Sequence, residues 1–109
     1  MEKYNGYANY QTYIVALWID NDQGNIDYLT EMAAEAYNDA KDQKYFTKKE
    51  EAVIFLAERM KAFYEENMME DTEGLGGLWI DMLTDALYSV DWHELAGKYM
   101  EYYTETLEV

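Results

Sequence analysis

Apolar residues recur at helical spacing along most of the chain. The first group follows the i, i+3, i+4, i+7, i+8 pattern, which places side chains on one face of an α-helix. Asn9 stands where the N-cap of this helix is expected, and the short polar residues at 20–24 predict its end because they compete for backbone hydrogen bonds. The stripe consists of Tyr10, Tyr13, Ile14, Leu17 and Trp18.

Two further stripes predict a second and a third helix. The second helix is expected to end near Lys41, and a loop follows at 42–46. Thr47 and Glu50 then match the capping box, in which the Thr hydroxyl and the Glu carboxylate satisfy two amide donors at a helix start. The second stripe contains Ile26, Leu29, Met32, Ala33, Ala36, Tyr37 and Ala40, and the third contains Val53, Leu56, Ala57, Met60, Phe63 and Tyr64.

The segment 65–77 has the weakest helical pattern, with acids clustered before three glycines, and we interpret it as the longest loop. Two stripes follow it, and Asp91 and Glu94 between them repeat the capping pattern with Asp in place of Thr. The fourth stripe contains Leu78, Trp79, Met82, Leu83, Ala86, Leu87 and Val90, and the fifth contains Leu95, Ala96, Tyr99, Met100, Tyr103 and Leu107.

Helical stripes without a convincing strand predict an all-α fold, a compact bundle of about five helices. The length of 109 residues suits one domain that spans residues 1–109. We expect its core to contain Trp18, Trp79, Leu83, Leu56 and Leu95.

Charge changes this picture from an ordinary bundle to an unusually acidic one. Asp and Glu number 23 against 8 Lys and Arg, which gives a formal net charge of −15. Nucleic acid and anionic lipid would repel such a surface, so we expect neither direct nucleic-acid binding nor membrane binding, and a basic protein as the partner. The chain has no recognisable signal peptide, and on that ground we expect a cytoplasmic protein.

Few residues of the chain could form a catalytic site. Ser89 is the only serine and His93 the only histidine, so a hydrolytic triad has almost no candidates, and no Glu-x-x-His pair for a di-iron site occurs. Carboxylates are plentiful, but a small bundle with acids on its polar faces offers no cleft for a glycosidase. We therefore expect no enzyme, no catalytic residue and no cofactor.

One segment invites comparison with a calcium loop. Asp20, Asp22, Gly24 and Glu31 fall at positions 1, 3, 5 and 12 of the calcium-binding register, but that loop requires an oxygen ligand at position 5 and Gly at position 6. Here Gly24 and Asn25 occupy those positions. An interhelical turn with capping acids is the favoured interpretation, and a calcium site is the alternative.

The acids of the second helix form a row at i+4 spacing: Asp27, Glu31, Glu35 and Asp39. The helical rise places neighbouring carboxylates about 6 Å apart, close to the spacing of successive phosphates on one nucleic-acid strand. Like charges at this spacing destabilise a helix by roughly 0.2 to 0.5 kcal/mol per pair, so the row has a cost. The alternative is a merely solvated face.

A second acidic region lies between Lys61 and Lys98, where the chain has no Lys or Arg. A cationic partner would meet an uninterrupted negative field there. The predicted partner-binding residues come from this region and from the helical row, and they are Asp27, Glu31, Glu35, Asp39, Glu66, Glu70, Asp71, Glu73, Asp81 and Asp85.

Tyrosine and methionine suggest an alternative binding surface. The chain has 12 tyrosines, too many for one small core, and Tyr and Met are favoured at protein interfaces. Tyr4, Tyr7, Tyr102, Met68 and Met69 are the candidates, with ordinary exposed rim residues as the simpler interpretation.

Two motifs carry a resemblance to a known family. The segment 9–22, which reads NYQTYIVALWIDND, and the segment 90–96, which reads VDWHELA, resemble a family of small acidic proteins of unknown function that phages, plasmids and actinobacterial or firmicute genomes carry. The resemblance implies no catalytic residues. The mobile-element association implies anti-defence activity, since small acidic phage proteins include DNA mimics that inhibit restriction and CRISPR enzymes.

These observations predict an inhibitor of a nucleic-acid-binding host-defence enzyme, a CRISPR effector first and a restriction enzyme second. The protein would act as an acidic DNA mimic that occupies a Lys/Arg groove. The alternative is a non-enzymatic interaction module that binds through the tyrosine and methionine surface, with the acids serving only to steer the encounter.

Overall fold

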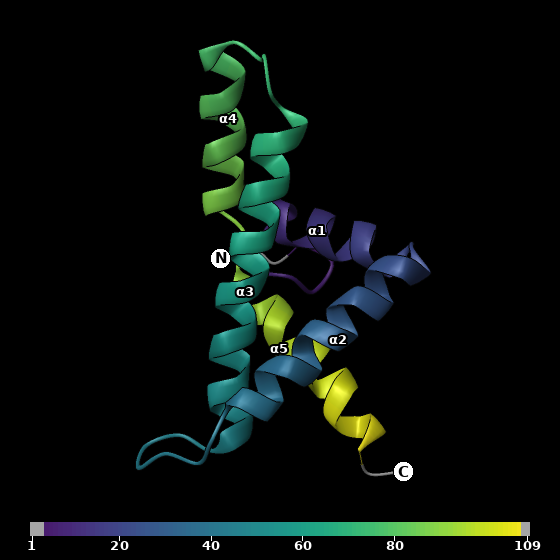
Figure 1. The fold of residues 1–109 in the computed structure, drawn as a ribbon. Coiled ribbons are helices and arrows are strands. Elements are labelled where there is room, and N and C mark those ends of the chain that lie inside the picture. Colours follow the sequence, from purple (N-terminus) through teal and green to yellow (C-terminus); the bar gives the residue numbers. More distant parts are fainter. Residues whose placement is uncertain (1–3, 108–109) are drawn as a thin grey trace.

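The computed structural model describes residues 4–107 and consists of five helices (Figure 1). The all-α prediction is confirmed: the structure is 76% helical. No strand occurs within residues 4–107 apart from an isolated bridge between Tyr4 and Tyr7, and none of the helices described there is long and apolar enough to cross a bilayer. The helices are α1 (Tyr10–Asp20), α2 (Gln23–Asp39), α3 (Lys48–Asp71), α4 (Gly77–Tyr88) and α5 (Trp92–Thr106).

Polar side chains fix the start of four helices. Asn9, Asp22 and Asp91 each accept a hydrogen bond from a backbone amide of the first turn of α1, α2 and α5. Thr47 and Glu50 form the predicted capping box at the start of α3, and the hydrogen bonds from the Thr47 backbone and side chain hold the pKa of Glu50 below its ordinary value. By contrast, the N-cap residue of α4 is Gly76, which supplies no side-chain cap.

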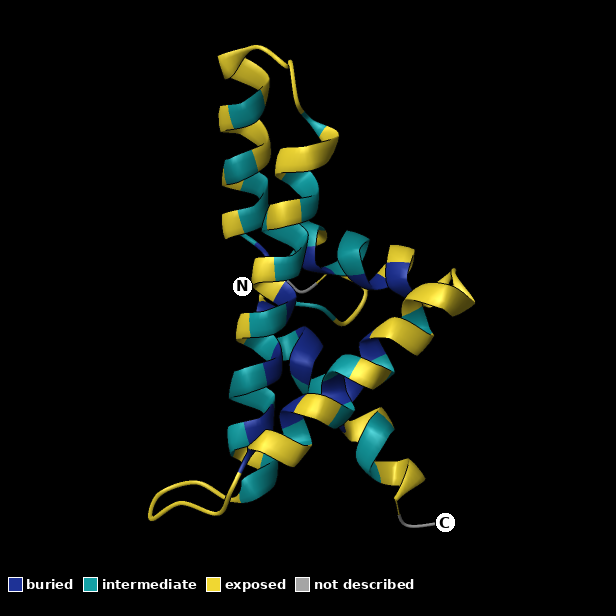
Figure 2. Ribbon diagram, viewed as in Figure 1, coloured by how far each residue is buried: buried dark blue, intermediate teal, exposed yellow. Residues whose placement is uncertain are grey.

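The core lies where α2, α3 and α5 cross. Figure 2 shows the buried segments of these three helices gathered there. Small side chains let the helix backbones approach closely, and larger ones fill the remaining space. The fully buried alanines are Ala33, Ala36, Ala52 and Ala96, and the larger buried side chains include Leu29, Leu56, Met60, Leu95 and Met100.

The predicted loop at 65–77 is wrong in its first half, because α3 continues to Asp71 and only a short turn precedes α4. Glu and Met are good helix formers, so the helix propagates without a buried stripe to mark it. Gly74 adopts a φ of +89°, the left-handed conformation that favours glycine, in the turn that reverses the chain. With 24 residues, α3 extends beyond the crossing point and carries α4 beside its end (Figure 1).

The predicted core is right for two residues and wrong for three. Leu56 and Leu95 are fully buried, whereas Trp18, Trp79 and Leu83 are 72%, 55% and 39% exposed. The buried residues of α1 are instead Thr12, Ala16 and Ile19, and α4 has none. The physical reason is position: α4 lies beside the end of α3, beyond the point where the helices cross.

The buried tryptophan is Trp92, whose ring stacks on Tyr64 at a centroid separation of 5.5 Å. Desolvation by this packing raises the pKa of Tyr64 to about 12. From the sequence, Trp92 was named only as part of a motif and was not predicted as a core residue. Trp92 nevertheless follows the Asp91 cap directly and begins α5, the helix with the most buried residues.

Hydrogen bonds attach α1 to the start of α5. The buried hydroxyl of Thr12 accepts a hydrogen bond from the Asp91 amide at 2.8 Å and donates one to the Asn9 side chain at 2.6 Å. At the other end of α1, Asp20 accepts hydrogen bonds from Lys98 and Tyr99. Burial works to lower the pKa of Lys98, but Asp20 and Tyr7 outweigh it and raise that pKa above its ordinary value.

The position of the core gives a first prediction. Leu56→Ala should destabilise the fold by about 2 to 5 kcal/mol, because it leaves a cavity where the three helices cross. The matched variant Leu78→Ala, at a position that is 66% exposed on α4, should change stability by less than about 0.5 kcal/mol. Urea unfolding followed by circular dichroism measures both, and equal losses would place the core elsewhere.

The buried Thr12 gives a second prediction. Thr12→Val preserves the shape of the side chain but removes the acceptor for the Asp91 amide, which should cost about 1 to 3 kcal/mol. Thr30→Val is the control, because the Thr30 hydroxyl only donates to the Ile26 carbonyl one turn earlier in its own helix. Thermal unfolding of the two variants should separate them clearly, and a larger loss for Thr30→Val would contradict this account of the α1 attachment.

Candidate protein-binding surfaces

The acidic row of α2 is present as the spacing predicted. Asp27, Glu31, Glu35 and Asp39 all lie on α2 and all are exposed, and Figure 2 shows α2 with one exposed face and one buried face. Residues four apart on a helix lie on the same side, so the carboxylates project together. The opposite side of α2 carries Leu29, Ala33 and Ala36 into the core, which holds the row on a rigid support.

A base from α3 modifies one end of the row. Arg59 forms an ion pair with Asp39, with the guanidinium 2.7 Å from the carboxylate. Arg59 also lines a surface pocket of about 220 Å³ together with Glu31 and Glu35. Exposed ion pairs are weak in water, so Asp39 remains acidic surface, but the carboxylates farther from this pair, beginning with Asp27, carry the stronger field.

The second set of predicted acids lies on the helical hairpin formed by α3 and α4. Glu66, Glu70 and Asp71 belong to the last turns of α3, Glu73 lies in the turn, and Asp81 and Asp85 lie on α4. All six are exposed. Most of them are therefore on helices rather than on the predicted loop, at the end of the molecule away from the core, where α4 buries no residue (Figure 1).

The predicted tyrosine and methionine surface does not form as one patch. Tyr4 and Tyr7 pack against the rings of Tyr10 and Tyr13 beside α1. Tyr102 lies on the last turns of α5, whereas Met68 and Met69 lie near the end of α3. Figure 1 places these two helix ends on opposite sides of the core, so the five residues cannot contact one partner site together.

An apolar groove between α1 and α4 is the feature that sequence reasoning missed. A pocket of about 380 Å³ lies between Tyr10, Ile14 and Val15 of α1, Met68 of α3, and Leu83, Ala86 and Leu87 of α4. A second pocket, of about 480 Å³, shares Leu83 and continues along α4 past Leu75, Trp79 and Met82. We call these two adjoining pockets the α1–α4 groove. The sequence did contain a signal for this groove. Residues 65–71 have no apolar stripe, so the apolar stripe of α4 has no matching stripe on the end of α3 to pack against.

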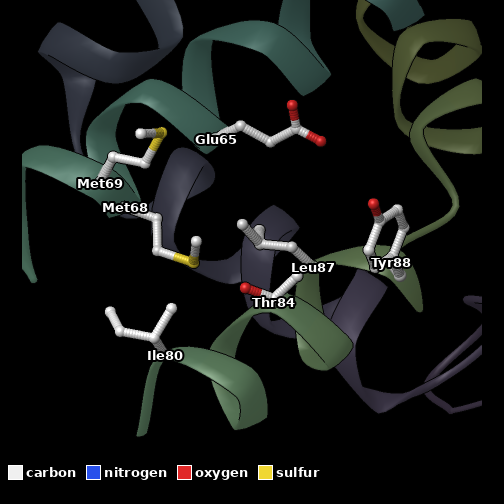
Figure 3. A pocket seen from close by; sticks show the side chains of 7 residues that line it. All are labelled: Glu65, Met68, Met69, Ile80, Thr84, Leu87 and Tyr88. Carbon is white, nitrogen blue, oxygen red and sulfur yellow. The ribbon is translucent and has the colours of Figure 1, made fainter. Parts of the chain in front are cut away.

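A smaller pocket lies on the other side of the hairpin. It has a volume of about 330 Å³, and Glu65, Met68 and Met69 of α3 face Ile80, Thr84, Leu87 and Tyr88 of α4 across it (Figure 3). Met68 and Leu87 also line the α1–α4 groove, so these two side chains form the seam between α3 and α4.

The segment compared with a calcium loop is an interhelical turn, as favoured. Only residues 21 and 22 separate α1 from α2, and residues 23–31 are helical. Asp22 caps α2 and Asp20 binds Lys98 and Tyr99, so both acids have structural roles. Within residues 4–107, His, Asp and Glu side chains form no group of three or more that could hold a metal ion.

Comparison with known proteins identifies a family. The model of a family described as "Family of unknown function (DUF7249)" matches residues 1–103, which include α1 to α4 and most of α5. The chain belongs to this family. No curated protein and no solved structure matches it.

The two sequence motifs that carried the resemblance meet in the structure. Asn9 and Thr12 of the first motif are hydrogen-bonded to Ser89 and Asp91, at the boundary of the second. Glu94 of the second motif accepts a hydrogen bond from the Ala8 amide, directly before the first. Their polar residues therefore attach α1 to α5, a structural role, and the acidic row of α2 lies outside both motifs.

The geometry of the row gives a third prediction. Glu31→Lys should stabilise the free protein by roughly 0.5 to 1 kcal/mol, because the like-charge pairs with Asp27 and Glu35 become opposite-charge pairs. Glu31→Gln should give a smaller gain, since it removes repulsion without adding attraction. Urea unfolding at low ionic strength measures both gains, and about 1 M salt should reduce them. Destabilisation by Lys at this exposed position would show that the attraction of Glu31 to the nearby Arg59 outweighs repulsion along the row.

Proposed function

We propose that this protein is a non-enzymatic inhibitor that presents the carboxylates of α2 to the Lys/Arg groove of a nucleic-acid-binding enzyme. The observation that carries the proposal is the exposed row of Asp27, Glu31, Glu35 and Asp39 on one side of a helix whose other side is buried. A basic groove built for phosphates would accept carboxylates at similar spacing, and no bond would be broken.

Two physical arguments support α2 over the hairpin acids as the mimic surface. The α2 row is a single line of four carboxylates, whereas the hairpin acids are divided between α3, the turn and α4. In addition, the core holds α2 in place, so little conformational entropy is lost when the row binds. The like-charge repulsion along the row is relieved when cationic side chains of the partner lie between the carboxylates.

The target class follows from two separate considerations. The carboxylates are spaced like successive phosphates, which supports a partner whose groove binds nucleic acid. The resemblance to proteins of mobile elements adds host-defence enzymes, CRISPR effectors first and restriction enzymes second, as the groups to test. The second candidate function is an interaction module in which acids only steer the encounter, and the exposed apolar groove between α1 and α4 favours it.

The fourth prediction concerns inhibition of DNA cleavage by purified CRISPR effectors and restriction enzymes. We expect the protein to inhibit at least one of them, with inhibition reversed by excess duplex DNA and lost steeply between about 50 mM and 200 mM salt. Glu31→Lys with Glu35→Lys should abolish the inhibition. Glu66→Lys with Glu70→Lys is the matched control, because it makes the same charge change at the same spacing on α3 and should retain most of the inhibition.

The two double variants separate the alternatives. Loss of inhibition only in the Glu66 and Glu70 variant would move the binding surface to the hairpin. Inhibition that survives both variants and high salt would contradict DNA mimicry and support an apolar interface instead. Absence of inhibition across the enzymes tested would also count against the proposal. Circular dichroism of each variant establishes that it remains folded.

A further inference from the structure

The exposed apolar faces of α1 and α4 line one groove. Tyr10 and Ile14 of α1 lie on one side of it, and Leu17 and Trp18 continue the same stripe along α1 with exposed side chains. Trp79, Met82 and Leu83 lie on the α4 side and are exposed as well. Contiguous exposed apolar surface of this kind marks a binding site in folded proteins.

The shape of the groove suits a helix as its occupant. Its two pockets, of about 380 and 480 Å³, adjoin at Leu83 and run beside α4 from Val90, just after this helix, to Leu75, just before it. The first pocket lies between α1 and α4, and the second continues along α4 alone. An elongated apolar surface of this kind receives the apolar face of an amphipathic helix. Met68 and Met82 add flexible, polarisable side chains that adapt to different apolar partners.

The charge around the groove decides which helix would bind. The segments that form its walls, residues 10–20 and 65–90, contain no Lys or Arg. Their acids are Asp20, Glu65, Glu66, Glu70, Asp71, Glu73, Asp81 and Asp85. None of these acids lines either pocket, but the segments that form the groove carry negative charge alone, so a helix with Lys and Arg beside its apolar face would be attracted to them.

The same charge argues against a second copy of this chain as the occupant. A symmetric dimer through the groove would bring two acidic surfaces together, since each chain carries a formal net charge of −15. Like-charge repulsion at such an interface would oppose the apolar contact. For a partner of opposite charge, the apolar contact and the charge attraction would both favour binding.

We propose that the α1–α4 groove binds a basic amphipathic helix of another protein, with Trp79, Met82 and Leu83 contacting its apolar face and the hairpin acids contacting its Lys and Arg side chains. This site is separate from the acidic row of α2 and does not depend on DNA mimicry. Trp79 is the expected anchor, since exposed tryptophans at the centre of an apolar patch dominate binding energies.

The test uses a synthetic peptide of about 18 residues made of Leu and Lys, with Leu at i, i+3, i+4 and i+7 so that it forms an amphipathic helix. Calorimetry at about 0.15 M salt should show binding to the wild-type protein, accompanied by a gain of helicity in the peptide. Trp79→Ala with Met82→Ala, which leaves every charge unchanged, should weaken binding by about tenfold or more.

Three controls separate the groove from general attraction to an acidic protein. Tyr102→Ala truncates an exposed aromatic side chain on α5 and should bind as the wild type does. A peptide with the same composition in scrambled order should bind at least about tenfold more weakly, because it presents no continuous apolar face. A peptide with Glu in place of Lys should not bind, because the acidic protein would repel it.

Several results would overturn the inference. Equal binding by the Trp79 and Met82 variant, or by the scrambled peptide, would show that charge alone attracts the helix. A concentration-dependent dimer in sedimentation that this variant abolishes would identify a second copy as the occupant. Glu31→Lys with Glu35→Lys should change peptide affinity by less than about threefold, so failure of the DNA-mimic proposal and failure of this one remain distinguishable.

Discussion

Close packing of α2, α3 and α5 through small side chains is the constraint on which the rest of the structure depends. Ala33, Ala36, Ala52 and Ala96 are fully buried at the crossing, and alanine alone among helix formers permits such an approach without a polar group to satisfy. The larger side chains around them complete the core. With this contact in place, α1 needs only Ala16, Ile19 and a few hydrogen bonds to attach.

The same crossing determines which surfaces remain free. Because the core lies along the first part of α3, the last turns of that helix extend beyond it and α4 packs beside them without burying any residue (Figure 2). The apolar stripe of α4 is therefore available for another molecule, and so is that of α1. In a small domain, apolar residues in excess of what one core can cover become candidate binding surface.

The charged residues also differ between the helical crossing and the surfaces that it leaves free. The bases are concentrated between Lys41 and Lys61, and Lys49, Arg59 and Lys98 form ion pairs within the helical crossing region. The last turns of α3, the following turn and α4 hold acids without any base, and α2 retains its row of carboxylates on the solvent side. The fold thus presents two acidic regions of different character: a polar row on α2, and a hairpin end that carries both acids and exposed apolar side chains.

The sequence by itself determined the number of helices, where most of them begin and the acidic row, because these depend on contacts within a few residues; it placed the end of α3 too early. Asn9, Thr47 and Asp91 act through the next turn, and the i+4 spacing of Glu31 and Glu35 fixes their common side on any helix. Only the tertiary structure decided which apolar stripe is buried. Trp18 and Trp79 have the periodicity of core residues, but burial depends on a facing helix, and the crossing of α2, α3 and α5 leaves none in front of them.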